Sequence, residues 1–368
     1  MDLNSAKFSR GLLSLIISFF ALSSPVVALH AAQDDAELEE LLAEEREEAD
    51  RLRRRGLHKE ALSLLREHLR DEPEDAASRS LRAACRMDQG DWKGAELDLR
   101  RALADCPSGL DGLSTRRAAA RLLGELCLRL GRSEEALKLV GDAEAGISPA
   151  TDGRDAWVLS RALLANGLRA EAEDALKAGA EGSRGQSWQG LLARARCQQA
   201  LGDLEGANQT LLEAEVLAKR VSGPEAEISV ALGDLFFEAY REISDVEISA
   251  DARYREALRL CPENEAALLG LFRVRRVNWK KSREPASRWL SIASSKHSNS
   301  VEVRLAACVY DLEDGKLPSV RARLRGLEEL AGGRREVQTL RAALAWVEHR
   351  REECETILET LLQRDPGD

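Results

Sequence analysis

Apolar residues recur three and four positions apart along most of this 368-residue chain. Over residues 59–71, for example, Ala61, Leu65 and Leu69 fall on one side of an α-helix and form an apolar stripe. Strand-like alternation of apolar and polar residues does not extend over any useful length. The pattern therefore predicts an all-α protein. The first four helices are expected over residues 42–55, 59–71, 77–88 and 92–105.

Four residue types recur in this region with a fixed spacing of 34 positions. A period of this size is typical of an array of stacked helix pairs. Glycine ends a helix at low steric cost, alanine lets two helices pass closely, and proline stops the second helix of a pair. The first set and its copy are Gly56, Ala61, Leu65, Pro73 and Gly90, Ala95, Leu99, Pro107.

Glycine, alanine five residues later and proline twelve further on resemble the signature of the tetratricopeptide repeat family, and in particular its exported bacterial arrays. The resemblance implies a right-handed superhelical solenoid of about nine antiparallel helix pairs. The array is expected to fill residues 42–368, with regular repeats over 42–221 and degenerate repeats over 222–368. Three later units keep the glycine and alanine positions: Gly131 and Ala136, Gly167 and Ala172, and Gly202 and Ala207.

The N-terminal residues 1–32 have the form of a secretory signal peptide. Lys7 and Arg10 precede an apolar run, and small residues near positions 28–31 offer cleavage sites. An acidic lead-in, residues 33–41, follows. We therefore expect an exported protein, periplasmic or secreted, and the alternative is that the apolar run stays as a membrane anchor.

Composition narrows the classes of ligand. The formal net charge of -10 argues for solubility and against nucleic acid as the main ligand. The seven cysteines are odd in number and widely spaced, so we expect buried small apolar side chains rather than a disulfide framework.

Patterns for catalysis, metals and cofactors are missing from the sequence. The five histidines form no His-Glu-x-x-His pattern, and no Cys-x-x-Cys pair, nucleophile elbow or phosphate loop occurs. We therefore expect a non-catalytic protein with no cofactor and no metal.

In the family that the chain resembles, the first helices of the repeats line the concave surface, where peptides bind. Guanidinium groups pair well with carboxylates, so a protein or peptide partner with an acidic segment is expected on this face. Glu125 lies in the same lane and could pair with one of the arginines. The family's carboxylate-clamp pattern of Asn and Lys is absent. The candidate binding residues are Arg121, Arg154, Trp157, Arg161 and Arg196.

A basic run with one aromatic residue, Trp279, follows residue 272. Such a run can grip an anionic surface, either phospholipid headgroups or an acidic protein. The alternative is the enlarged turn of a weak repeat, kept soluble by its charge. Its basic residues are Arg273, Arg275, Arg276, Lys280, Lys281 and Arg283.

These observations favour a protein-interaction scaffold of the cell envelope. The alternative is a substrate-positioning module of a secreted hydrolase or peptidase-like system whose catalytic part is on another chain. At the C-terminal end no polar capping helix is expected, so self-association or a partner is predicted there. The side chains expected to be partly exposed at this end are Leu344, Trp346, Ile357 and Leu361.

Overall fold

The computed structural model describes residues 42–106, 112–142, 146–148, 152–182, 187–239, 246–277 and 284–364. The expected signal peptide (1–32), the acidic lead-in (33–41) and Pro107 lie outside these residues. Every regular element in the described part is helical, which confirms the predicted all-α class. No described helix combines the length and the apolar character that a membrane span needs.

The described helices form nine consecutive pairs, which we number as repeats one to nine. Repeat one pairs residues 42–54 with α3 (His58–Asp71). The next four repeats are α4 (Ala76–Asp88) with α5 (Trp92–Asp105), α6 (Leu113–Arg129) with α7 (Ser133–Gly141), α8 (Gly153–Ala165) with α9 (Arg169–Glu181), and α10 (Trp188–Ala200) with α11 (Leu204–Val221). The last four are α12 (Ala226–Ala239) with α13 (Val246–Leu260), α14 (Glu265–Val277) with α15 (Ala286–Lys296), α16 (Val301–Glu313) with α17 (Leu317–Ala331), and α18 (Arg335–Val347) with α19 (Arg351–Arg364).

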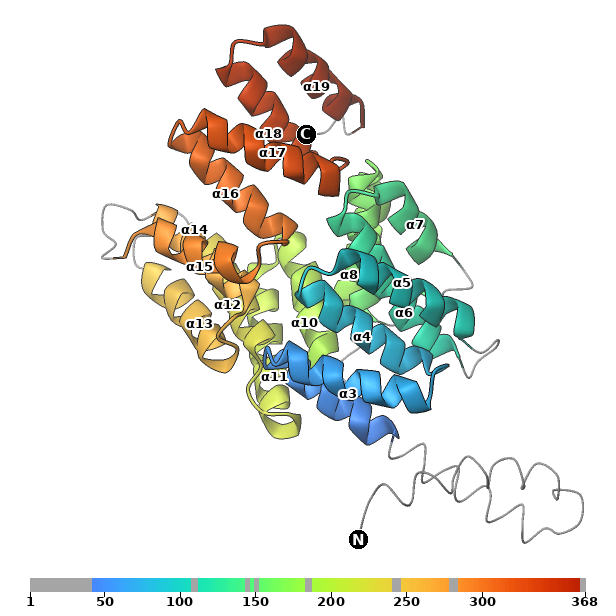
Figure 1. Ribbon diagram of the computed structural model, residues 1–368. Coiled ribbons are helices and arrows are strands. Elements are labelled where there is room, and N and C mark those ends of the chain that lie inside the picture. Colours follow the sequence, from blue (N-terminus) through green and yellow to red (C-terminus); the bar gives the residue numbers. More distant parts are fainter. Residues whose placement is uncertain are drawn as a thin grey trace, which may run out of the picture.

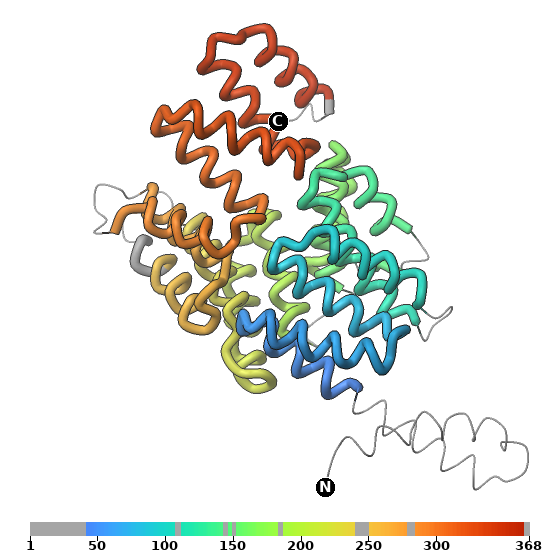
Figure 2. Tube along the Cα trace, viewed as in Figure 1, coloured from blue at the N-terminus to red at the C-terminus, as the bar shows by residue number. Residues whose placement is uncertain are grey.

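The pairs stack into two layers that wind as a superhelix (Figures 1 and 2). Each second helix packs on its own first helix and on the first helix of the next repeat, whereas successive first helices such as α6, α8 and α10 also touch one another. First helices therefore form an inner layer and second helices an outer layer, with the apolar core between them.

The repeat turns have the backbone that the glycine positions predicted. Gly131 and Gly202 have φ angles of 76° and 82°, in the left-handed region that favours glycine. In repeat nine the corresponding residue is His349, with φ 60°. The alanines five residues after the turn glycines, and all seven cysteines, are buried.

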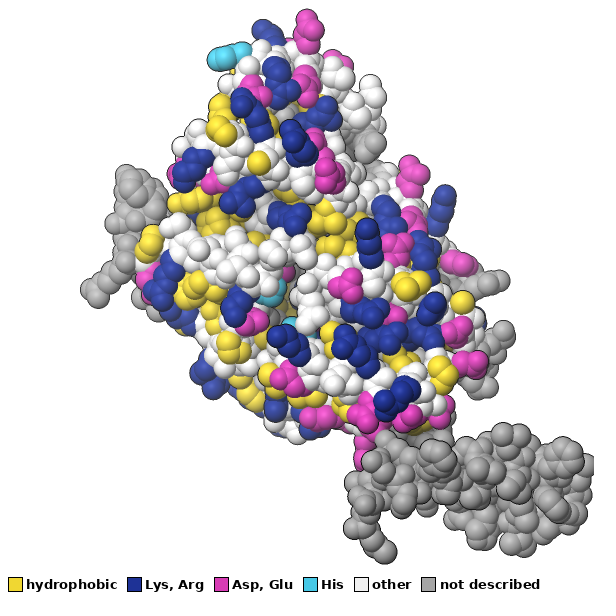
Figure 3. All heavy atoms as spheres, in the orientation of Figure 1, with side chains coloured by type: hydrophobic (Ala, Val, Ile, Leu, Met, Phe, Trp, Pro, Cys, Tyr) yellow, Lys and Arg dark blue, Asp and Glu magenta, His cyan; other side chains and the backbone are white. Residues whose placement is uncertain are grey.

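The superhelix closes on itself along a line that we call the seam. There the turns of repeats one to three, at Gly56, Gly90 and Gly131, pack on the loops that follow repeats six to eight. A Cβ atom on Gly131 would lie 2.4 Å from the backbone nitrogen of Arg334, and one on Gly90 would lie 2.8 Å from the Cβ atom of Asn299. Figure 3 shows the surface hollowed near the centre of this face, between the N-terminal repeats and the later ones.

Side chains reinforce the seam. The indole N–H of Trp92 donates a hydrogen bond to the carbonyl oxygen of Asn299 at 3.1 Å. Arg54 of repeat one donates to Glu225, at the start of repeat six, and lies over the ring of Trp188 at 5.5 Å. Residues about two hundred positions apart are thus in direct contact.

The C-terminal end of the array agrees only in part with the sequence-based expectation. Trp346 is mostly exposed, as expected, and Leu361 is half-buried. Leu344 and Ile357 are buried instead, because Leu344 packs in the core between repeats eight and nine and Ile357 packs between α18 and α19.

Candidate functional site

One position of the first helices, six residues before the turn glycine, lines the inner layer in repeats three to five. It holds Glu125 on α6, Arg161 on α8 and Arg196 on α10. All three side chains are half-buried. Because successive first helices pack side by side, these three residues form one row, which we call the inner lane.

Arg161 has an aromatic neighbour. Its guanidinium carbon lies 6.0 Å from the centroid of the Trp157 ring, within the range of a cation–π contact. Burial lowers the pKa of Arg161, while the Glu125 carboxylate acts in the opposite direction. Arginine stays charged nevertheless. No ion pair joins Arg161 to any other described residue.

The other two members of the inner lane differ from each other. Arg196 has no hydrogen bond or ion pair within the described residues. Glu125 pairs with Arg129 on its own helix at 3.2 Å, and not with Arg161 or Arg196. Burial would raise the pKa of Glu125, but the charges of Arg129, Arg161 and Arg196 outweigh burial and lower it. In the inner lane, therefore, the guanidinium groups of Arg161 and Arg196 form no ion pair with a carboxylate of the described residues.

The other two candidate arginines stabilise the fold. Arg121 donates to the fully buried Asp155 at 3.0 Å, and Arg117 donates to the same carboxylate. Arg154 pairs with Asp152 at 2.8 Å, just before α8. Each guanidinium already has its carboxylate: the pairs with Asp155 hold the start of α8 against α6, and the Arg154–Asp152 pair lies within the start of α8. The structure places Arg161 and Arg196 in the inner lane, with Trp157 beside Arg161, and engages Arg121 and Arg154 in ion pairs outside the lane.

A cleft of about 370 Å³ opens beside Arg161, between repeats three and four on one side and repeats eight and nine on the other. Arg334 lies on the far wall, where Glu302 and Glu336 hold it at 2.6 and 2.8 Å. Arg161, by contrast, forms no ion pair with a carboxylate of the described residues. The apolar part of the lining comprises Leu128, Leu164, Ala165 and Leu361.

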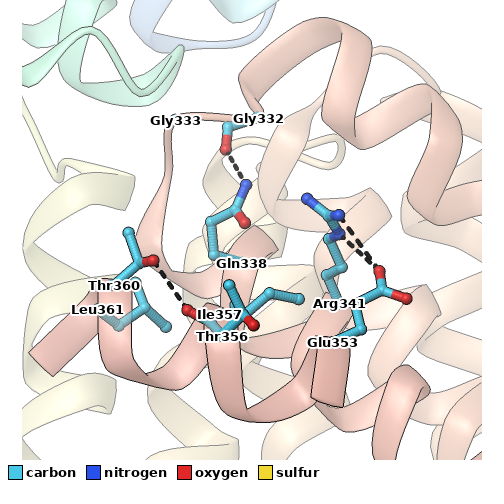
Figure 4. A pocket seen from close by; sticks show the side chains of 9 residues that line it. All are labelled: Gly332, Gly333, Gln338, Arg341, Glu353, Thr356, Ile357, Thr360 and Leu361. Atoms are coloured by element: carbon cyan, nitrogen blue, oxygen red, sulfur yellow. Dashed lines mark hydrogen bonds and ion pairs between the residues drawn. The ribbon is translucent and has the colours of Figure 1, made fainter. Parts of the chain in front are cut away.

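A second hollow of about 440 Å³ adjoins this cleft and shares Gly333 and Leu361 with it. Figure 4 shows its walls, built from α18, α19 and the loop before α18. Gln338 donates to the carbonyl oxygen of Gly332 at 2.6 Å, and Arg341 pairs with Glu353 at 3.2 Å. Its polar groups are thus bonded to one another, which makes Arg161 the stronger candidate for a ligand contact.

The described part of the basic run is also occupied by ion pairs. Arg273 pairs with Asp234 at 2.6 Å, and Arg276 pairs with Glu313. Arg275 pairs with Asp251 at 2.5 Å. Lys280, Lys281 and Arg283 lie outside the described residues. Within the described part, these arginines connect neighbouring helices, and anionic-surface binding stays a prediction. Figure 3 shows basic and acidic side chains interspersed over the face it presents.

No pattern in the sequence predicts the cleft. Its walls come from Arg161 and Leu164 on one side and from Gly333, Arg334 and Leu361 on the other, which no periodic signal connects. In the described part of the chain, no group of three or more His, Cys, Asp and Glu side chains is placed to hold a metal ion.

No family model and no curated protein matches the chain. Among solved structures, a chain of the APC/C hetero-tetramer Cut9–Hcn1 is 17% identical over 81% of this chain, with a TM-score of 0.48. This chain spans about half, 54%, of the length of that one. A tetratricopeptide repeat protein from Parabacteroides merdae is 13% identical over 73% of this chain and 98% of its own, with a TM-score of 0.44.

Human IFIT1, solved as a dimer with m7Gppp-AAAA, is 14% identical over 84% of this chain and 77% of its own, with a TM-score of 0.44. The fold is a tetratricopeptide-like superhelix. That assignment rests on the chain's own features: the period of 34 residues, the nine described helix pairs and the left-handed turn residues.

Proposed function

We propose that this protein is a non-catalytic protein-interaction scaffold that binds an acidic, extended segment of a partner on the inner lane. Arg161 and Arg196 supply the charge, and Trp157 supplies an apolar surface beside Arg161. The observation that carries the proposal is that these two guanidinium groups occupy the same position of successive repeats and have no carboxylate partner among the described residues. Comparable arginines nearby, such as Arg121, are paired.

The geometry also suggests a spacing for the partner's acids. Neighbouring packed helices lie about 8–10 Å apart, and side chains on one face of an extended segment recur about every 7 Å. Carboxylates two to four residues apart would therefore reach both arginines, given the length of the arginine side chain. Charge-assisted hydrogen bonds to carboxylates are about twice as strong as neutral ones.

The test uses the chain from residue 33 and a fluorescein-labelled peptide in which Asp alternates with Ala. Its control is the same peptide with Asn in place of Asp. We expect Arg161→Glu with Arg196→Glu to weaken binding by about tenfold or more, a loss of about 1.4 kcal/mol. Binding should also weaken as salt is added.

A matched control reverses Arg66 and Arg101, which are exposed, lie on the outer helices α3 and α5 and have the same 35-residue spacing. This control should bind the Asp peptide as the parent does. Equal binding by the parent and by the Arg161→Glu, Arg196→Glu variant would contradict the proposal. Binding of the Asn peptide as tightly as the Asp peptide would contradict it too.

We also propose export to the periplasm or the exterior, on the strength of the signal-like residues 1–32. The alternative role, a substrate-positioning module for a separate hydrolase, predicts hydrolytic activity only when a captured partner is present. Affinity capture from an envelope extract, with the parent and the Arg161→Glu, Arg196→Glu variant, identifies the partner. The hydrolytic activity of the captured complex then distinguishes the two roles, because a scaffold binds its partner without turnover.

A further inference from the structure

The cleft beside Arg161 contains an apolar surface as well as the guanidinium group of the inner lane. Leu164 and Ala165 follow Arg161 by three and four positions on α8, so the three residues lie on one face of this helix, with Cβ atoms roughly 5–6 Å apart. Leu164 and Ala165 both line the cleft and are exposed. One wall of the cleft therefore carries a charged group and an apolar surface one helical turn apart.

Leu164 is more exposed than its counterparts in the two preceding repeats. At the position three residues before the turn glycine, repeat two has Met87 and repeat three has Leu128, which are 5% and 9% exposed. Leu164 occupies the same position in repeat four and is 44% exposed. An apolar residue at this position is thus covered in repeats two and three and open to the cleft in repeat four.

The seam fixes the opposite wall of the cleft. A Cβ atom on Gly333 would lie 2.3 Å from the carbonyl oxygen of Gly131, and both glycines line the cleft. The backbones of the two walls are therefore in contact at this point, and Leu361 lines the same space as Leu164. The volume of about 370 Å³ falls within the range of ligand pockets, about 300–1,000 Å³, which are usually largely preformed and lined by apolar residues with a few polar groups.

The charge of the lining determines which kind of segment fits the cleft. The described lining residues include three arginines and one glutamate. Arg334 is already held by two carboxylates, but Arg161 forms no ion pair with a carboxylate of the described residues. The excess of positive charge favours an acidic segment over a basic one. Leu164 beside Arg161 favours a segment whose acid is close to a bulky apolar residue.

We propose that the cleft is an anchor pocket for one bulky apolar side chain of the acidic segment that binds on the inner lane, and that Arg161 pairs with the acid nearest to this side chain. The proposal rests on the acidic-segment binding proposed above and adds a second determinant of specificity to it. Side chains on one face of an extended segment recur every two residues, about 7 Å apart, which is comparable with the distance between Arg161 and Leu164. The apolar residue is therefore expected two residues from the acid that Arg161 binds.

The test measures the binding of two fluorescein-labelled peptides of equal charge to the full chain by fluorescence anisotropy. In both peptides Asp alternates with Ala. The Phe peptide carries Phe two residues before the first Asp and two residues after the last Asp, so that the segment can bind in either direction. The Ala peptide has Ala at these two positions. We expect the Phe peptide to bind about tenfold more tightly than the Ala peptide, because the ring moves from water into the cleft.

Two variants change the pocket without changing the arginines. Leu164→Asn should reduce the difference between the peptides to about threefold or less and leave the affinity for the Ala peptide within about twofold of the parent. Its matched control is Leu212→Asn, because Leu212 is 43% exposed and lies on the outer helix α11. This control should keep the full difference. Ala165→Phe narrows the cleft without removing a buried side chain and should also reduce the difference. If circular dichroism shows that Leu164→Asn unfolds, Ala165→Phe takes its place.

Equal binding of the two peptides to the parent would overturn the anchor pocket, and the comparison of the Asp and Asn peptides would still decide whether the inner lane binds acidic segments. A full difference that persists in both Leu164→Asn and Ala165→Phe would overturn the pocket as well. If neither peptide binds to the parent, both proposals fail. A dimer of the parent that Leu164→Asn dissociates, measured by analytical ultracentrifugation, would assign the cleft to a second copy of the chain instead.

Discussion

The turns of repeats one to three and the turns of repeats five and eight share one backbone conformation but have different surroundings. Gly131 and Gly202 both have a left-handed φ. A Cβ atom on Gly131 would overlap the backbone of Gly333 and Arg334, whereas a Cβ atom on Gly202 or Gly315 would meet no described atom within 4 Å. The same residue type therefore serves the turn alone in one region, and both the turn and the seam in the other.

This difference separates two sources of stability. Contacts within and between neighbouring repeats follow the period and hold the array together locally. The seam adds contacts between repeats five or six positions apart along the array, such as that of Trp92 with Asn299. A solenoid closed in this way resists bending more than its repeat contacts alone would allow. The seam should therefore limit changes in the distances between the first helices that carry the inner lane.

The largest expected effect comes from Gly131→Ala compared with Gly202→Ala. A left-handed alanine costs about 1 kcal/mol, which is all that Gly202→Ala should lose. At Gly131 the added methyl group also overlaps backbone atoms, and overpacking of this kind costs about 1–3 kcal/mol more. Urea unfolding measures both values, and equal losses would mean that the seam does not form.

A comparison of two tryptophans measures how much the hydrogen bond at the seam contributes to stability. Trp92 and Trp289 are equally buried, but the indole N–H of Trp289 has no acceptor among the described residues. Replacement by Phe removes a similar area in both cases, so Trp92→Phe should lose about 1 kcal/mol more than Trp289→Phe. Thermal melts of the two variants provide the comparison. An equal or smaller loss for Trp92→Phe would argue against the bond to Asn299.

The open turn of repeat nine offers a stabilising change. His349 adopts φ 60° without the freedom of glycine, and its side chain is exposed. His349→Gly should therefore raise the free energy of unfolding by about 0.5–1 kcal/mol. Gly315→Ala, the reverse change at the equivalent turn, should lower it by a similar amount. A loss of stability on His349→Gly would contradict this account of the turn.

The smallest expected effect is a pH dependence at the turn of repeat one. Burial lowers the pKa of His58, the neighbouring Arg53 and His297 lower it further, and Asp88 and Glu263 act in the opposite direction. The unfolded chain therefore takes up this proton first as pH falls below about 6.5, so unfolding becomes easier on acidification. His58→Asn should reduce the loss of stability between pH 7 and pH 5.5, measured by urea unfolding. An unchanged slope would mean that His58 contributes nothing to it.

The sequence predicted the local architecture well, because a helix pair is specified by nearby residues. The stripe of Ala61, Leu65 and Leu69 and the turn at Gly56 lie within fourteen residues of one another. Later repeats keep the same spacing of glycine and alanine, so the same helix pair could be predicted for them. The exposed end was predicted less well, since Leu344 and Ile357 face neighbouring helices that the stripe alone does not place.

The candidate site could be predicted only in part. Periodicity placed Arg161 and Arg196 on the inner lane, but it did not show that Arg121 reaches Asp155, which lies one repeat later. An acid one period after an arginine is a signal that could have identified this pair. The seam and the cleft carry no such signal, because Gly131 and Gly333 are brought together by the curvature of the whole array.

The closed superhelix is the central claim, and a distance across the seam tests it most directly. Lys93 and Ser298 are exposed and flank the contact between Trp92 and Asn299, and all seven native cysteines are buried. Spin labels on Lys93→Cys and Ser298→Cys, measured by double electron–electron resonance, should give one short and narrow distance distribution. A long or broad distribution would show that the repeats form an open solenoid in solution.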